Sequence, residues 1–269
     1  MSEPELQAPF LRHWGHGARA AVLIHCSLAH SGAWTALAGE LAGRLTMTAF
    51  DLPGHGRGPD WTPGQDLHAQ STCMAADLVA DGPADLIGHS FGATVALRLA
   101  LERPGAVRSL VLIEPVLFAA ARAAGDPAFD MHMRDTAPVD AAWDAGDAEA
   151  ATRRFIALWG AGTPWEALPE AQRAYMAARI GFIPETAPVL VEDRAGLLTP
   201  GRLEGLNCPV LIVTGGESPP VMPAIARALA ARLPHAQRVD VPGAAHMVPL
   251  THPQQVGAAI RGFLDGAAG

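Results

Sequence analysis

A serine at position 90 stands in a pentapeptide whose spacing is typical of a catalytic nucleophile. The pentapeptide Gly88-His89-Ser90-Phe91-Gly92 ends the apolar run "ADLIGHS" and precedes the Ala- and Leu-rich segment "ATVALRLALERP". Glycines two residues before and after a serine allow a strand and a helix to approach closely around a sharp, strained turn. We therefore predict that such a turn presents the hydroxyl of Ser90 as a nucleophile.

A serine hydroxyl needs a base that takes its proton during attack and returns it to the leaving group. His246 is the candidate base, because it lies in "VPGAAHMVPL", a loop after the last predicted strand. Three other histidines have weaker claims, since His25 ends a predicted strand, His55 lies in a Gly-rich turn and His89 flanks the nucleophile. We expect structural roles for these three.

Composition narrows the classes of ligand and cofactor. A formal net charge of −8 argues against a nucleic acid or an anionic membrane surface as the partner and favours a small neutral or apolar molecule. All 19 basic residues are arginine, so chemistry that needs a lysine amine is excluded by count. The 11 histidines and the cysteines Cys26, Cys73 and Cys208 lack the spacing of a metal site or a disulfide framework. We predict that the protein uses no cofactor and no metal.

The beginning of the chain, "MSEPELQAPF", has neither a basic segment nor an apolar one. No apolar run approaches the roughly 18 residues of a membrane span. We therefore expect a cytoplasmic protein that is a monomer or a homodimer. The absence of lysine points to a GC-rich bacterial genome.

Strand-like and helix-like segments alternate along most of the chain. Short apolar runs end in turn residues, as buried parallel strands do, at residues 19–26, 45–54, 84–90, 107–115, 208–216 and 236–243. Segments with helical spacing lie between them, for example at 93–104, 223–234 and 254–264. The alternation predicts an α/β fold with a doubly wound, mostly parallel sheet.

The alternation stops between about residues 116 and 206, where the sequence is poor in strands. We predict a core formed by residues 1–115 and 207–269, with a helical cap inserted at 116–206. Helix breaks are predicted at Pro127, Pro138, Pro164, Pro184 and Pro188. The cap holds eight of the fifteen aromatic residues; some, such as Phe155 and Trp159, have ordinary core spacing on a helix, and others are candidates to line an apolar pocket.

The order of these motifs resembles that of the α/β-hydrolase superfamily over nearly the whole chain. The matching segments are "LIHCSLAHSGAW", "DLPGHGRG", the turn at Ser90, the helical insertion and "PGAAHMVPLTHP". The likeness is greatest to the branch of capped esterases, C–C hydrolases and haloalkane dehalogenases. A dehalogenase has Asp as its nucleophile and usually Trp after it, so Ser90 and Phe91 argue against dehalogenation. The resemblance also assigns the base to His246.

The negative oxygen formed during attack needs hydrogen-bond donors fixed in advance. One is expected to be the N–H of Phe91, the residue after the nucleophile. The resemblance assigns the other to the loop after "VLIH", where this chain reads His25-Cys26-Ser27, and aligns the donor with Ser27. The family has Gly where this chain has Cys26. Cysteine does not readily adopt a positive φ as glycine does, and it also brings a thiol to the site. We interpret Cys26 as a packed small residue rather than a second nucleophile.

The third group of the relay should accept the Nδ1 proton of His246. Most relatives hold an Asp for this purpose in the turn after the strand matched by "PVLIVTG", where this chain has Ser218. Glu217 is displaced from that place by one residue. Glu114 in "LVLIEPV" ends an apolar strand, and some members of the dehalogenase branch take their acid from this strand end. We favour Glu114, with Glu217 as the alternative acid and Asp193 or water as the fallback.

These residues predict a serine hydrolase that cleaves a carboxylic ester or lactone of a small, apolar substrate through an acyl-serine intermediate. One alternative is C–C bond hydrolysis of a vinylogous diketo acid, for which a cap arginine would bind the substrate carboxylate; the candidates are Arg134, Arg153, Arg154 and Arg179. The other alternative is a hydrolase-like receptor with little turnover, for which Cys26 and Ser218 would be signs of decay.

Overall fold

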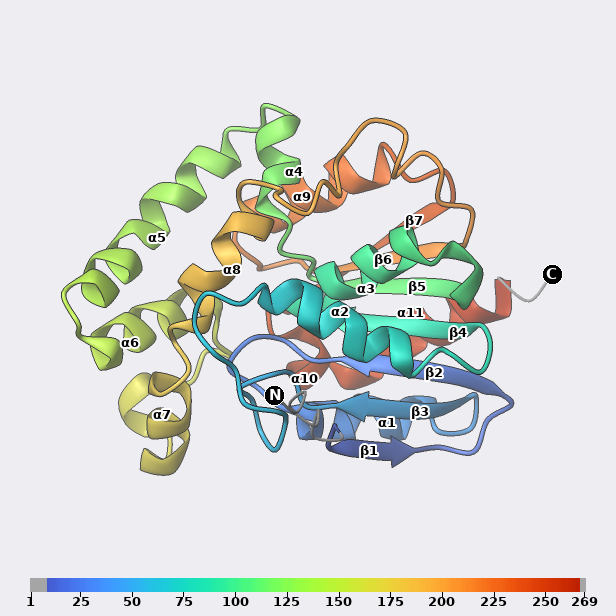
Figure 1. Cartoon of the computed structure of the whole chain (residues 1–269), viewed down its shortest axis with the longest axis horizontal. Helices are drawn as coiled ribbons and strands as arrows, with labels where there is room; N and C mark the ends of the chain where they lie inside the picture. Colours follow the sequence, from blue (N-terminus) through green and yellow to red (C-terminus); the bar gives the residue numbers. More distant parts are fainter. Residues whose placement is uncertain (1–8, 267–269) are drawn as a thin grey trace, which may run out of the picture.

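The centre of the protein is a mostly parallel sheet, seen in the computed structural model, which describes residues 9–266 (Figure 1). Within that range the sheet has seven strands in the order β1-β3-β2-β4-β5-β6-β7, and every neighbouring pair except β1 and β3 is parallel. The strands are β1 (Leu11–Trp14), β2 (Arg19–Ile24), β3 (Leu45–Phe50), β4 (Ala84–His89), β5 (Val107–Ile113), β6 (Val210–Gly215) and β7 (Ala236–Val241). The predicted fold class is confirmed.

Six of these strands lie within the six predicted runs, and β1 is an addition. β1 has four residues at the edge of the sheet, and its side chains are half-buried or exposed. Its sequence, LRHW, therefore carries none of the continuous apolar character by which the buried strands were predicted.

Helices cover both faces of the sheet. On one face α1 (Thr35–Leu41) and α11 (Pro253–Gly266) share an apolar cluster with Ala21 and Leu23 of β2. On the other face α2 (Leu67–Asp77), α3 (Phe91–Glu102) and α9 (Val221–Ala230) share a larger apolar cluster that includes Val22 and Ile24 of the same strand. Successive side chains of a strand point to opposite faces, so a strand buried on both faces must be apolar throughout.

Five helices follow β5 and precede β6 within the described residues: α4 (Phe118–Ala123), α5 (Ala128–Asp144), α6 (Ala148–Trp159), α7 (Glu170–Ala177) and α8 (Phe182–Leu190). Figure 1 shows α5, α6 and α7 standing away from the sheet, with α8 between them and the core. They share a separate apolar cluster around Val139, Trp165 and Ile180, which Leu28 of the core joins. Pro127 precedes α5 and Pro164 precedes a short 3₁₀ helix, as predicted breaks should, whereas Pro138, Pro184 and Pro188 lie inside α5 and α8.

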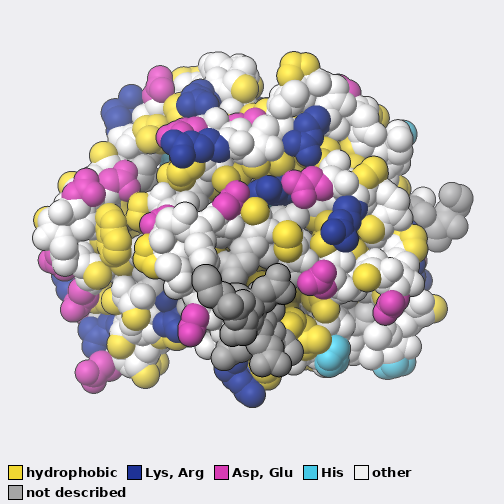
Figure 2. Space-filling view, viewed as in Figure 1, with side chains coloured by type: hydrophobic (Ala, Val, Ile, Leu, Met, Phe, Trp, Pro, Cys, Tyr) yellow, Lys and Arg dark blue, Asp and Glu magenta, His cyan; other side chains and the backbone are white. Residues whose placement is uncertain are grey.

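The surface is mixed in charge. On the face in Figure 2, arginines and acidic side chains alternate rather than forming a patch of one sign. No helix among the described residues has the length and apolar character needed to cross a membrane. Most of the stretch that we interpret as lacking a targeting signal, residues 1–8, lies outside the described residues.

Candidate active site

The turn at Ser90 joins the end of β4 to the start of α3. Ser90 has φ 56° and ψ −117°, a conformation that residues with a side chain seldom adopt. A Cβ at Gly88 would overlap the carbonyl oxygen of Gly92, and a Cβ at Gly92 would overlap that of Ile24. The two glycines therefore let β4, α3 and β2 meet around the strained serine, as the spacing predicted.

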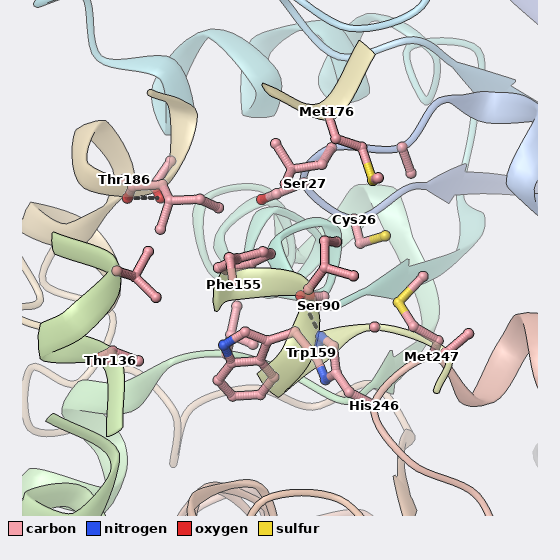
Figure 3. Close-up of a pocket in the computed structure, with 18 of the residues that line it drawn as sticks. Cys26, Ser27, Ser90, Thr136, Phe155, Trp159, Met176, Thr186, His246 and Met247 are labelled. Carbon is pink, nitrogen blue, oxygen red and sulfur yellow. Dashed lines mark hydrogen bonds between the residues drawn. The ribbon is translucent and has the colours of Figure 1, made fainter. Parts of the chain in front are cut away.

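The Ser90 hydroxyl lies in a chain of hydrogen-bonded side chains. His246 Nε2 is 3.0 Å from Ser90 Oγ (Figure 3). His246 Nδ1 is 2.9 Å from Glu114 Oε2. All three side chains are buried, and Glu114 is fully so. The order of the groups is that of a nucleophile, a base and an acid that orients the base.

Glu114 directly follows β5, and both of its carboxylate oxygens have partners. Oε1 accepts the N–H of Gly215 at 2.7 Å, while Oε2 faces His246. Its own N–H donates to the carbonyl of Val213 at 2.8 Å, and its backbone has φ 51°. A buried carboxylate requires such partners, because water no longer solvates its charge.

The other candidate acids lie elsewhere. Glu217 is exposed, and its backbone N–H bonds to the carbonyl of Ala244. Ser218 Oγ is buried without a hydrogen-bond partner. The carboxylate of Asp193 accepts the N–H groups of Leu197 and Leu198 at 2.8 and 2.9 Å. Among the described residues, Glu114 is the carboxylate within hydrogen-bond distance of His246 Nδ1.

Two further side chains hold His246 in place. His89 Nε2 donates to the carbonyl of His246 at 2.9 Å, and burial lowers the pKa of His89 to about 3, so its ring stays neutral. Trp159 of α6 contacts the imidazole edge to face, with ring centroids 4.7 Å apart. His89 thus has the structural role expected from the sequence. Sequence reasoning treated Trp159 as helix core and missed this contact, because no local pattern indicates that α6 lies over the loop of His246.

A tight turn at Cys26–Ala29 lines the same cavity as Ser90 and is closed by the Ala29 N–H, which donates to the Cys26 carbonyl at 3.4 Å. The positive φ that a glycine would supply is found at Leu28, with φ 61°, and not at Cys26. His55 Nε2 holds this conformation by accepting the Leu28 N–H at 3.0 Å, and His25 Nδ1 donates to the Cys26 carbonyl at 2.8 Å. Burial raises the pKa of the Cys26 thiol to about 12, so the thiolate that a nucleophile requires does not form near neutral pH.

The two expected oxyanion donors are Ser27 and Phe91. Within the described part of the chain, neither backbone N–H donates to another residue. Ser27 lines the same cavity as Ser90, and in Figure 3 Ser90 lies between Ser27 and His246. Ser27 therefore lies on the side of Ser90 away from His246.

A cavity of about 870 Å³ opens above Ser90, and apolar side chains of the core and the five inserted helices form most of its wall. Four of the eight aromatic residues between 116 and 206 line it: Phe118, Phe155, Trp159 and Tyr175. Phe155 and Trp159 pack in apolar clusters, as their helical spacing predicted, and they also face the cavity, which the sequence did not indicate. Among the described residues no group of three or more His, Cys, Asp or Glu side chains is arranged to hold a metal ion.

The cavity wall is nearly free of charge. Asp140 is its one acidic side chain within the described range, and the wall contains no arginine. Burial and the neighbouring Asp144 raise the pKa of Asp140, and burial lowers that of His132 to about 4, so His132 is neutral near pH 7. Of the cap arginines considered above, Arg153 pairs with Glu149 at the surface and Arg179 stacks on the ring of Tyr175.

Buried neutral histidines make the fold sensitive to acid. Burial lowers the pKa of His25 to about 4 and those of His55, His68 and His89 to about 3. The unfolded chain binds protons with a histidine pKa of about 6.5. Their contribution to stability is therefore complete above about pH 6.5 and is lost as the pH falls toward 3. We expect the free energy of unfolding to fall with acid by about 1.4 kcal/mol per pH unit for each such histidine.

Urea unfolding measured at intervals from pH 7 to pH 4.5 tests this expectation. His68→Gln is the matched variant, because His68 bonds Thr94 and Arg98 rather than the Ser90 relay. The free energy of unfolding of this variant should depend less steeply on pH, by the contribution of one histidine, about 1.4 kcal/mol per pH unit. A stability that stays constant over this range would contradict the predicted neutral state of these rings.

The fold and the Ser90 relay together define a class of protein. The alpha/beta hydrolase family model matches residues 21–259, and the chain belongs to this family. A pimeloyl-[acyl-carrier protein] methyl ester esterase from Methylococcus capsulatus is 31% identical over 261 residues, which cover 95% of this chain and 98% of that protein. Lipase LipV from Mycobacterium tuberculosis is 39% identical over 110 residues, covering 40% of this chain and 41% of the lipase.

A solved structure supports the fold assignment. A hydrolase from Pseudomonas aeruginosa superimposes with a TM-score of 0.71 at 22% sequence identity, over 94% of this chain and 93% of the other. At this level of identity the likeness concerns the fold. The resemblance predicted from the sequence motifs is confirmed.

Proposed function

We propose that this protein is a serine hydrolase that cleaves carboxylic esters through an acyl-Ser90 intermediate. The observation that carries the proposal is the buried chain of hydrogen bonds from Ser90 Oγ through His246 to Glu114 at the floor of the cavity. The two relatives, named a methyl ester esterase and a lipase, support the same reaction class.

In the first half of the reaction, Ser90 Oγ attacks the ester carbonyl carbon while His246 Nε2 takes the hydroxyl proton. Glu114 keeps the other imidazole proton on Nδ1 and stabilises the cation that forms. The carbonyl oxygen becomes negative and accepts hydrogen bonds from the backbone N–H groups of Ser27 and Phe91. The intermediate then collapses, the C–O bond to the alcohol breaks, and His246 returns its proton to the leaving oxygen.

In the second half, water replaces the alcohol as the nucleophile. His246 takes a proton from water, and the hydroxide adds to the acyl carbon. The intermediate then collapses: the bond between the acyl carbon and Ser90 Oγ breaks, His246 returns the proton to Oγ, and the acid is released. Residues 116–206 act as a cap, and the core at 1–115 and 207–269 supplies every group that transfers a proton. The reaction balances without a cofactor or a metal.

The preferred substrate is a neutral ester with a sizeable apolar part. The volume of about 870 Å³ is near the upper end of the usual range for small-molecule sites, roughly 300–1,000 Å³, so the substrate need not be small. A carboxylate on the substrate would meet Asp140 and no arginine among the described lining residues. This arrangement argues against hydrolysis of a diketo acid, which needs a cation. Lactones have the required neutrality and remain within the proposal.

Two measurements test this function. A fluorophosphonate should label the protein once, on Ser90, and a Ser90→Ala variant should remain unlabelled. A panel of neutral esters from acetate to decanoate, lactones, ω-carboxylated esters of equal length and a vinylogous diketo acid should show preference for the neutral, longer compounds. A receptor would bind these compounds without turnover or labelling, and a C–C hydrolase would cleave the diketo acid best.

A further inference from the structure

The single tyrosine of the chain joins three segments that are distant in sequence. Tyr175 lies on α7, and its hydroxyl donates to the carbonyl of Ala29 at 2.8 Å while accepting the N–H of Gly56 at 2.8 Å. Ala29 belongs to the loop after β2 and Gly56 to the loop after β3. One phenol oxygen therefore connects the inserted helices to two loops of the core.

The loop after β2 is the one that carries the proposed oxyanion donor. Ala29 closes the tight turn on Cys26, and Ser27 lies inside this turn. The side chain of Leu28 is buried in the same apolar cluster as Met176, the residue next to Tyr175. The turn is thus held from the core side by His55 and from the cap side by Tyr175 and the packing of Leu28.

The phenol is itself held in position. The Arg179 guanidinium lies 3.7 Å from the centroid of the Tyr175 ring and donates to the Tyr175 carbonyl at 2.9 Å. Burial raises the pKa of the Tyr175 hydroxyl, so it keeps the proton that it donates to Ala29. Gly56, the other partner, has φ 53°, and an added Cβ there would overlap the carboxylate of Asp51.

We propose that Tyr175 is a positioning residue for the oxyanion hole: its hydroxyl fixes Ala29, and through the turn it fixes the N–H of Ser27 where the substrate oxygen becomes negative. This inference rests on the proposed ester hydrolysis. It means that the contact between the cap and the core determines whether the Ser27 N–H is in position to complete the oxyanion hole. A donor displaced by a fraction of an ångström loses much of its stabilisation of the transition state.

The test uses Tyr175→Phe, which removes the hydroxyl and keeps the ring beside Arg179. An alkylboronic acid forms an anionic tetrahedral adduct with Ser90, whereas the alkyl carboxamide of equal length binds without one. The variant should bind the boronic acid about tenfold more weakly and lose about tenfold in kcat, since one donor is misplaced rather than removed. Its KM and its affinity for the carboxamide should stay within about twofold of the parent values.

Glu185→Ala is the matched control, because it removes another bond between the inserted helices and the core, from the Gly64 N–H to Glu185 Oε2 at 3.4 Å. This variant should bind both inhibitors normally. Equal boronate affinity in Tyr175→Phe and the parent would overturn the inference while the ester hydrolysis stands. A parent protein that neither hydrolyses esters nor reacts with the fluorophosphonate would overturn the proposed function, and this inference with it.

A second readout does not depend on turnover. Because Tyr175 is the one tyrosine, growth on 3-fluorotyrosine labels this position alone. Tyr175 lines the cavity in which both inhibitors bind, so both can shift the single ¹⁹F resonance, and the boronate adduct should shift it further than the carboxamide does. A ¹⁹F chemical shift that changes no more when the adduct forms than when the carboxamide binds would show that the phenol is not coupled to the oxyanion hole.

Discussion

Replacing Glu114 with glutamine is expected to lower kcat about 10⁴-fold while the protein stays folded. The amide oxygen can still accept the Gly215 N–H in place of Oε1. The amide NH₂ then faces His246 Nδ1, where the carboxylate accepted a proton before. This arrangement forces the imidazole proton onto Nε2, so the ring can no longer accept the proton of Ser90. The measurement is kcat for a neutral ester, with circular dichroism and urea unfolding to check the fold.

Glu217→Gln is the matched control for this prediction. Glu217 is exposed at the turn after β6, so its substitution should leave kcat unchanged within about twofold. The reverse result, a fully active Glu114→Gln with an inactive Glu217→Gln, would move the acid to the turn after β6. Loss of activity in neither variant would mean that the base needs no carboxylate.

Ser90→Ala is expected to lower kcat about 10⁶-fold, the largest effect of any single substitution here. Alanine has the same backbone preferences as serine at φ 56°, so the stability of the fold should change little. The double variant Ser90→Ala/Glu114→Gln should be no slower than Ser90→Ala, because residues that act as one relay are not additive. Trace parent enzyme must be removed before such small rates are measured, because its activity would exceed that of the variant.

Two outcomes would contradict this view of the relay. If Ser90→Ala kept more than about one per cent of the parent rate, another nucleophile would be responsible. If the double variant lost the product of the two single effects, Glu114 would act independently of Ser90 and His246. Comparison of the single and double variants therefore tests the connection between the groups as well as their identity.

The parallel strands could be predicted because each is an apolar run bounded by turn residues, a signal contained in a few adjacent positions. The same holds for the turn at Ser90, where two glycines report a close approach of β4, α3 and β2. The proximity of Glu114 to His246 could also be anticipated, since the carboxyl ends of parallel strands meet at one edge of the sheet. A buried acid at a strand end needs a partner, and His246 is that partner.

Other features depend on how the inserted helices sit on the core, and no local pattern contains that information. The contact of Trp159 with His246 and the two bonds of Tyr175 join residues that are 87 to 146 positions apart, by subtraction of their numbers. The positive φ at Leu28 is another such case, because it is held by His55 from a different loop. Sequence reasoning expected the consequences of the missing glycine at Cys26 itself.

The position of Glu114 in the chain determines which segment could be exchanged with that of another hydrolase. Glu114 is the last residue before Pro115 and the inserted helices, so Ser90, Glu114 and His246 all belong to segments outside 116–206. A chimaera that exchanges 116–206 for the insertion of another hydrolase would inherit an intact relay with a new substrate chamber. The donor insertion would still have to bring a hydroxyl to the place of Tyr175 and an aromatic ring to the place of Trp159, so these two positions are the compatibility requirements for module exchange.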